Sequence, residues 1–308
     1  MILPKNEPRK LGSTNKKKLY LYGTSFSGKT TFASQFPNAL MLNTDGNIRF
    51  VTTPYVPIAN NVTVEGRLTK TKLAWQVFKD VIAELEKKDN TFETIIVDLV
   101  EDTYEHCRIY CYDKLGIEHE SDNSFKAWDF VRTEFLSTIK RLINLDYENI
   151  ILISHEDTSK DITKKGGDKI TAIRPNINEK IALKLAGMVD IVARVVIEDN
   201  VRKLNFKSDN VIFGGGRLKL STTEIPLDYD ALMQVYENST ENVGNVRTVQ
   251  PQVKEEPKPV PVEEVVEEPI TPVVEETIEP ITEVVEEVVV ETVVEEQPRR
   301  RRRMNLED

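Results

Sequence analysis

The chain has 308 residues and a formal net charge of −10, and its length suits one large domain or two small ones. The charge is uneven, because residues 1–250 hold 34 basic and 34 acidic side chains, whereas residues 251–308 hold 7 and 17. No apolar stretch approaches the ~20 residues of a membrane span, no signal peptide opens the chain, and Cys107 and Cys111 are typical of buried thiols. We therefore expect a soluble, cytoplasmic protein without membrane contacts.

The first half of the chain alternates short apolar runs with helical patterns. After a flexible lead (residues 1–17), the predicted strands are residues 19–22, 39–43, 94–98 and 149–154. The predicted helices are residues 31–36, ended by Pro37, and then residues 73–85, 100–115 and 125–144. An irregular stretch containing Pro54 and Pro57 separates the second strand from the second helix.

The second half begins with a polar, Lys-rich loop at residues 158–171. A helix is expected from near Pro175 to Leu185, and a last one over residues 228–236. Between them, two strands at residues 189–197 and 202–206 are joined by a turn at Asp199 and Asn200.

This order of elements predicts an α/β fold with a mostly parallel sheet, helices on both faces and a late hairpin at one edge, in a domain spanning residues 18–240. Residues 241–308 form a Glu/Val/Pro-rich segment that we expect to be disordered. It ends in a run of five arginines, Arg299 to Arg303. Its glutamates would compete with DNA for basic groups, whereas the arginines would bind a phosphate backbone or an acidic partner. The alternative is a solubilising spacer.

A phosphate-binding loop follows the first strand, because residues 23–30 fit the pattern G-x-x-x-x-G-K-[ST] and a helix comes next. Glycines permit close approach of the backbone, an exposed Lys29 would reach the β- and γ-phosphates of ATP, and the Thr30 hydroxyl would ligate Mg²⁺. The expected nucleotide-binding residues are Gly23, Thr24, Ser25, Phe26, Ser27, Gly28, Lys29, Thr30 and Thr31.

Two carboxylates at strand ends complete the expected site. Asp98 closes an apolar strand and is the predicted second Mg²⁺ ligand, with an ordinary strand-terminal Asp as the alternative. Asp45 follows the strand that we expect beside the phosphate-loop strand, where it either orients the attacking water or serves as a turn residue before Gly46.

The ordered set of motifs over residues 18–235 resembles the RecA-like core, and more closely the phage-encoded AAA/RecA-core ATPases of the Sak single-strand-annealing type. The resemblance is carried by residues 21–31, 36–37, 42–46, 95–98, 152–155 and 189–206. It implies that Asp45 activates water and that Ser154 and His155 sense the γ-phosphate, although a histidine that only caps its strand is the alternative for His155.

The same resemblance implies that single-stranded DNA binds the basic loop after His155, for which a plain solvated loop is the alternative. The DNA-binding candidates are Lys160, Lys164, Lys165, Lys169 and Arg174. It also implies a ring or filament of identical subunits in which a neighbour's basic residue completes each site. The candidates for that trans-acting residue are Arg202, Lys203, Lys207 and Arg217.

The resemblance thus favours a DNA-stimulated ATPase that assists phage recombination or strand annealing. It implies a single-strand-binding or other recombination protein as a further partner. The alternatives are a slow or non-hydrolysing ATP-dependent loader and a small-molecule kinase. The kinase is disfavoured because no Arg cluster closely follows His155.

Overall fold

The computed structural model describes residues 6, 16–119, 122, 124–163, 169–218 and 220–244. The chain divides into two units, residues 1–249 and 250–308, and all described residues belong to the first. The predicted acidic tail beyond residue 244, its arginine run and most of the predicted lead therefore lie outside the described residues.

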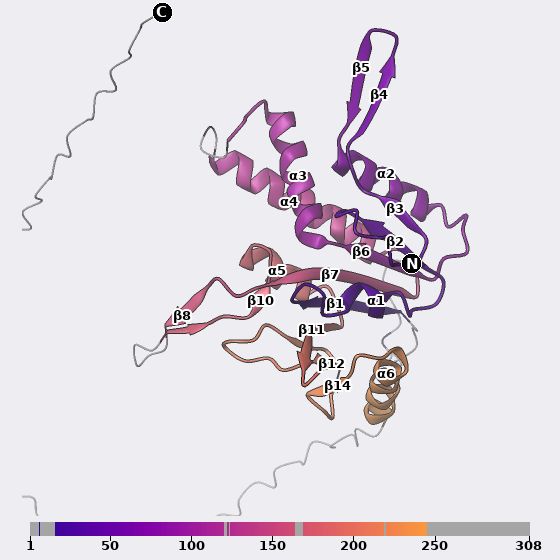
Figure 1. Cartoon of the computed structure of the whole chain (residues 1–308), viewed down its shortest axis with the longest axis vertical. Helices are drawn as coiled ribbons and strands as arrows, with labels where there is room; N and C mark the ends of the chain where they lie inside the picture. Colours follow the sequence, from indigo (N-terminus) through magenta and orange to yellow (C-terminus); the bar gives the residue numbers. More distant parts are fainter. Residues whose placement is uncertain are drawn as a thin grey trace, which may run out of the picture. The chain divides into compact units, whose positions relative to one another are not determined.

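A central sheet dominates the described unit and is built along the strand order β14-β12-β11-β1-β7-β6-β2-β3 (Figure 1). Strands β11, β1, β7, β6, β2 and β3 run parallel, and β12 and β14 add antiparallel strands at one edge. The bounds are β1 Lys17–Gly23, β2 Ala39–Asn43, β3 Tyr55–Pro57, β6 Thr94–Asp98, β7 Asn149–Asp157, β11 Ile191–Glu198, β12 Val201–Asn205 and β14 Glu224–Pro226. Two-residue strands β10 (Arg174–Pro175) and β13 (Gly215–Gly216) pair with β7 and β11.

The predicted α/β fold with its edge hairpin is confirmed. Residues Asp199 and Asn200, which join β11 to β12, have φ angles of 50° and 60°, the left-handed values that a tight hairpin turn requires.

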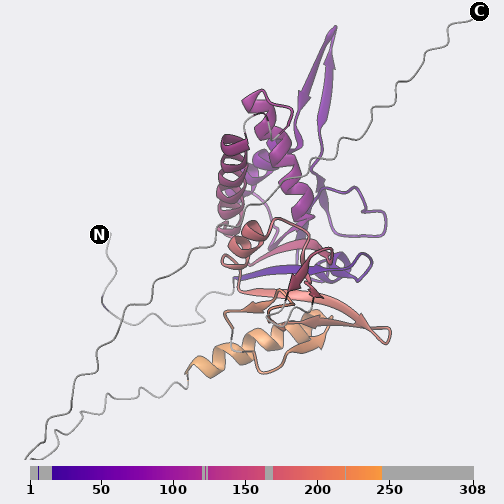
Figure 2. The same ribbon diagram turned by 90° about the vertical axis from the view of Figure 1, so that its left-hand side faces the viewer.

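Helices cover both faces of the sheet, as the edge-on view in Figure 2 shows. Successive strand residues point to opposite faces, so Tyr20 and Tyr22 enter one core, whereas Leu19 and Leu21 enter the other. The tyrosine side packs against α2 (Ala74–Glu86), α3 (Val100–Leu115), α4 (Ser124–Ile143) and α5 (Glu179–Ala186). The leucine side packs against α1 (Lys29–Ala33) and α6 (Tyr229–Gly244).

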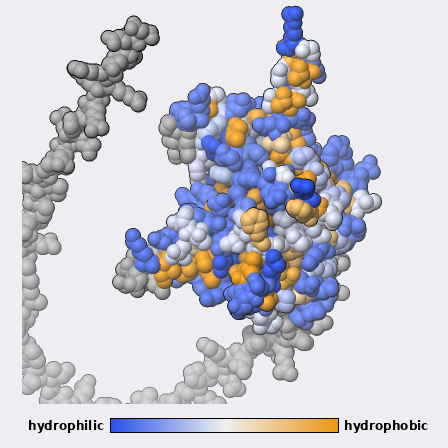
Figure 3. Space-filling view, in the orientation of Figure 1, coloured by the Kyte–Doolittle hydropathy of each residue, from blue (hydrophilic) through white to orange (hydrophobic). Residues whose placement is uncertain are grey.

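The stretch after β2 that the sequence predicts as irregular contains three strands. Strand β3 joins the sheet edge, and β4 (Asn61–Glu65) pairs with β5 (Leu68–Lys72) in a two-stranded arm that projects from the body (Figure 1). All of the arm's strand residues are exposed, and its apolar side chains interrupt an otherwise hydrophilic surface at the top of Figure 3. The sequence of β4, Asn-Val-Thr-Val-Glu, alternates polar and apolar residues and leads into Gly66, whose φ is 65°, so a hairpin signal was present in the sequence and was missed.

Two further expectations are corrected. The polar stretch predicted as a loop forms an antiparallel pair, β8 (Asp161–Thr163) with β9 (Lys169–Thr171), which continues the pairing of β10 with the end of β7. We call this two-stranded extension, residues 156–163 and 169–175, the ribbon. Helix α5 begins at Glu179 rather than near Pro175, because the Asn178 side chain accepts a hydrogen bond from the Lys180 N–H and caps the helix. None of the described helices is long and apolar enough to span a bilayer.

Candidate nucleotide-binding site

The phosphate loop lies at the carboxyl end of β1 and leads directly into α1. Gly28 has a φ of 98°, and its carbonyl accepts the first helical hydrogen bond from Phe32 at 2.9 Å. A Cβ on Gly23 would come within 2.5 Å of the Val195 carbonyl oxygen on the neighbouring strand β11. Both glycines of the motif are therefore required, Gly28 by its backbone angle and Gly23 by its contact with β11.

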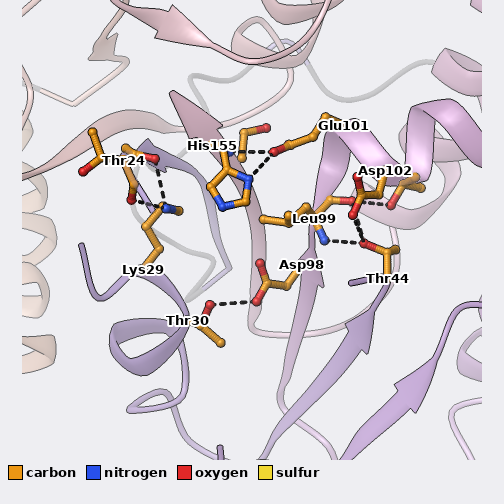
Figure 4. Close-up of polar contacts among 12 residues, drawn as sticks. Thr24, Lys29, Thr30, Thr44, Asp98, Leu99, Glu101, Asp102 and His155 are labelled. Carbon is orange, nitrogen blue, oxygen red and sulfur yellow. Dashed lines mark hydrogen bonds and ion pairs between the residues drawn. The ribbon is translucent and has the colours of Figure 1, made fainter. Parts of the chain in front are cut away.

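Lys29 is buried, which corrects the expectation of an exposed side chain. Its Nζ donates hydrogen bonds of 2.9 Å and 2.7 Å to the carbonyls of Gly23 and Thr24 (Figure 4). Burial lowers the pKa of Lys29, whereas the charge of Asp98 raises it. A phosphate chain would replace these carbonyls with stronger, charged acceptors.

Thr30 and Asp98 meet, as the sequence predicts for a Mg²⁺ site. The Thr30 hydroxyl donates a 2.8 Å hydrogen bond to Oδ2 of Asp98, and Oδ1 is buried without a partner among the described residues. Burial raises the pKa of Asp98 from 3.8 to about 6. A buried carboxylate oxygen beside a hydroxyl fits an oxygen-preferring cation, so the donor set is suited to Mg²⁺.

His155 lies beside the phosphate loop because β7 pairs with β1 in a register that sets His155 opposite Gly23. Oε1 of Glu101, in the first turn of α3, lies 2.9 Å from His155 Nδ1 and accepts the His155 backbone N–H at 2.8 Å (Figure 4). The hydrogen bond to Glu101 raises the pKa of His155. Glu101 was not among the residues predicted from the sequence, although its position three residues after Asp98 places it at the same sheet edge.

Asp45 lies in the same cavity, but its strand is not the neighbour of β1. Strand β2 pairs with β6 and β3, and both β6 and β7 lie between it and β1. The Asp45 carboxylate accepts hydrogen bonds from the Asn43 side chain at 2.8 Å and the Asn47 N–H at 2.9 Å. Asp45 is thus a turn residue and a cavity-lining residue at once.

A cavity of about 830 Å³ joins these groups. Lys29, Thr30, Asp45, Asp98 and His155 all contribute to its wall. Among the other expected nucleotide contacts, Ser25, Phe26 and Thr31 also line it, Thr24 binds Lys29 through its carbonyl, and Ser27 is buried beneath the loop. The structure therefore brings the predicted nucleotide, metal and catalytic residues together.

Three of the five predicted DNA-binding residues, Lys160, Lys169 and Arg174, lie on the ribbon that follows His155. Lys160 and Lys169 are exposed, with Asp157 and Asp161 on the same ribbon. The Arg174 guanidinium is paired with Glu179. Lys164 and Lys165 lie outside the described residues.

The four candidates for a trans-acting residue separate into two groups. Three have partners on their own chain, because Lys203 is paired with Glu198 and Glu224, Lys207 is paired with Asp209, and Arg217 donates to the Gly187 carbonyl. Arg202 instead lines the cavity against the phosphate loop of its own chain.

A mostly parallel sheet with a glycine-rich loop, a buried lysine and a Thr–Asp pair at its carboxyl edge defines a P-loop NTPase domain. A family model described as an AAA domain matches residues 15–218, more than half of the chain, so the protein belongs to that family. No curated protein matches the chain.

Proposed function

We propose that this protein is an ATPase that binds single-stranded DNA, is stimulated by it, and assists recombination or strand annealing. Membership of the AAA family supports the nucleotide-binding part of this proposal. The DNA-binding part is supported by the path of β7, which leads from the nucleotide cavity into the ribbon.

The proposed reaction assigns roles to four residues of the cavity wall. Lys29 transfers its hydrogen bonds from the Gly23 and Thr24 carbonyls to the β- and γ-phosphates. Thr30 and Asp98 would hold Mg²⁺, and the ion would supply positive charge to the phosphates. Asp45, fixed by its hydrogen bonds to Asn43 and Asn47, is the carboxylate that orients water.

The Glu101–His155 pair connects the cavity to the ribbon. His155 lines the cavity, and Glu101 fixes both its ring and its backbone N–H. Ribbon pairing begins at the next residue, where Glu156 is opposite Pro175, and the His155 carbonyl accepts the Asn176 N–H at 2.9 Å. A change of His155 between triphosphate and diphosphate states is thereby transmitted directly to the base of the ribbon.

This path from Lys29 through His155 to the ribbon is the observation that carries the proposal. It supports single-stranded DNA as the partner, with the exposed Lys160 and Lys169 binding the phosphate backbone. We further propose a homo-oligomer as the active form, as in the RecA-like ATPases that the sequence resembles, with a single-strand-binding or other recombination protein as a further partner.

Steady-state ATP turnover tests the proposal, measured without DNA, with single-stranded DNA and with the duplex of the same sequence. We expect single strands to stimulate turnover more than the duplex does, and a Lys29→Ala variant to lose the stimulated rate. Tight ATP binding without turnover would instead indicate a loader, and turnover only with a small phosphate acceptor would indicate a kinase.

A further inference from the structure

Arg202 packs against the phosphate loop of its own chain. A Cβ built on Gly28 would lie 3.1 Å from Arg202 Cδ, 3.2 Å from its Nε and 3.3 Å from Leu227 Cδ2. Arg202 belongs to β12, and its carbonyl accepts the Leu227 N–H at 3.0 Å. The hairpin edge of the sheet therefore forms one wall of the nucleotide cavity.

The guanidinium of Arg202 is available to a ligand. Its side chain is exposed and, within the described ranges, has no hydrogen-bond or ion-pair partner, in contrast to Lys203 at the next position. The aliphatic stem is fixed over Gly28 while the charged end remains free. This arrangement is suited to an anionic ligand seated on the loop.

The strand order shows which end of a nucleotide Arg202 would meet. Thr30 and Asp98 mark the Mg²⁺ and γ-phosphate end, and both Asp98 on β6 and His155 on β7 lie on one side of β1. Strand β12 lies on the opposite side of β1, beyond β11. A nucleotide that extends across the loop therefore has its α-phosphate and ribose on the Arg202 side.

We propose that Arg202 binds the nucleotide in cis, at its α-phosphate and ribose end, with Leu227 beside it as an apolar contact for the nucleoside. Arg202 then contributes equally to binding of nucleoside diphosphates and triphosphates. It is not the residue that a neighbouring subunit supplies to the γ-phosphate. This inference rests on nucleotide binding at the P-loop but not on DNA binding or turnover.

Equilibrium binding of Mg-ADP and of a β,γ-imido ATP analogue, measured without DNA, tests the assignment. Arg202→Gln removes the charge and keeps the first two methylenes of the side chain. We expect both affinities to fall by a similar factor, about ten- to a hundredfold, because a hydrogen-bonded charge is removed. Val201→Ala, at the exposed neighbouring position on β12, is the matched control and should bind both nucleotides like the parent.

Unchanged ADP affinity in Arg202→Gln would overturn the proposal, and so would a loss confined to the triphosphate analogue. It would also be overturned if Arg202→Gln protein recovered ADP binding on addition of Lys29→Ala protein, which supplies Arg202 from a neighbour. Arg202→Lys, which keeps a charge, should bind ADP more tightly than Arg202→Gln, and equal weakness of the two variants would also contradict it. Thermal melts of each variant establish that the fold is intact, and failure of DNA stimulation would leave these binding results unaffected.

Discussion

Asp98 accepts the Thr30 hydroxyl at one carboxylate oxygen, at 2.8 Å, and has no partner for the other among the described residues. The second oxygen is buried, so ionised Asp98 is poorly solvated until a cation reaches it. The ligand-free protein is therefore expected to hold an unfavourable charge at the position that we propose for Mg²⁺.

Asp98→Asn should stabilise the ligand-free protein at neutral pH. The pKa of Asp98 is raised from 3.8 to about 6 in the folded state, so its contribution to stability decreases as pH rises from about 4 to about 6. The amide carries no charge, so the substitution removes this loss of folding stability, which is at most on the order of 3 kcal/mol. Urea unfolding at pH 5 and pH 7.5 measures it, with the exposed Asp113→Asn as control. An Asp98→Asn protein less stable than its parent at pH 7.5 would contradict the assignment.

Asp45→Asn should spare ATP binding and slow turnover by about a hundredfold or more. The amide oxygen still accepts the hydrogen bonds from Asn43 and Asn47, so the turn is retained while the charge that we propose orients water is removed. Single-turnover hydrolysis with saturating ATP separates the chemical step from binding. Turnover equal to the parent's would assign the role to another carboxylate, and Glu101, which holds His155 at the cavity wall, is the first to test.

Glu101→Gln should lower the pKa of His155, which an NMR titration of the histidine ring measures directly. Glu101 raises this pKa, so the pair contributes stability that is present below about pH 6.5 and lost as pH rises through the folded-state pKa. The variant should therefore lose more stability at pH 6 than at pH 8.5. Equal losses at the two pH values would show that Glu101 does not act on the charge of His155.

Neutralising Lys160 and Lys169 together should reduce the salt dependence of single-strand binding. The log–log slope falls by roughly 0.7 for each phosphate on a single strand that the protein no longer neutralises. A matched double variant at Lys87 and Lys140, on other exposed parts of the described chain, controls for net charge. An unchanged slope in the ribbon variant would place DNA binding elsewhere.

Deleting residues 251–297 while keeping the arginine run should tighten single-strand binding. The deleted segment carries 15 glutamates, which would compete with DNA for basic groups. Deleting the arginines as well shows how much they add to the affinity. If removal of the glutamates leaves the affinity unchanged, the segment acts as a spacer or a docking site for another protein.

The buried elements were predictable because their residues follow the periods of strands and helices. Strand β6, for example, is buried at all five positions and is bounded in the structure as the sequence predicts. The β8–β9 pair was missed because its three-residue strands lie in a polar, Lys-rich stretch. The β4–β5 arm was missed although β4 alternates polar and apolar residues, because the two prolines before it favoured an irregular reading of the whole stretch.

The site residues that belong to a local sequence motif could be predicted. Those whose position depends on the order of strands in the sheet were harder to predict. Lys29, Thr30 and Asp98 follow from the loop and from an Asp at the end of an apolar strand. The position of Asp45 in the strand order was wrong, because two later strands, β6 and β7, insert between β1 and β2. The contacts of Glu101 with His155 and of Arg202 with the phosphate loop join residues more than 50 positions apart, and only the nearness of Glu101 to Asp98 could have been inferred from the sequence.

Calorimetric titration with the β,γ-imido ATP analogue is the most direct test of the nucleotide site. The titration is performed on the parent and Lys29→Ala proteins, first with Mg²⁺ and then with EDTA. Lys29 braces the ligand-free loop through Gly23 and Thr24, so a thermal melt accompanies each titration. We predict that the parent binds more tightly with Mg²⁺ than with EDTA, and that folded Lys29→Ala binds about a hundredfold more weakly. Parent-like affinity in folded Lys29→Ala, or a parent affinity that EDTA does not change, would contradict a nucleotide site built on Lys29, Thr30 and Asp98.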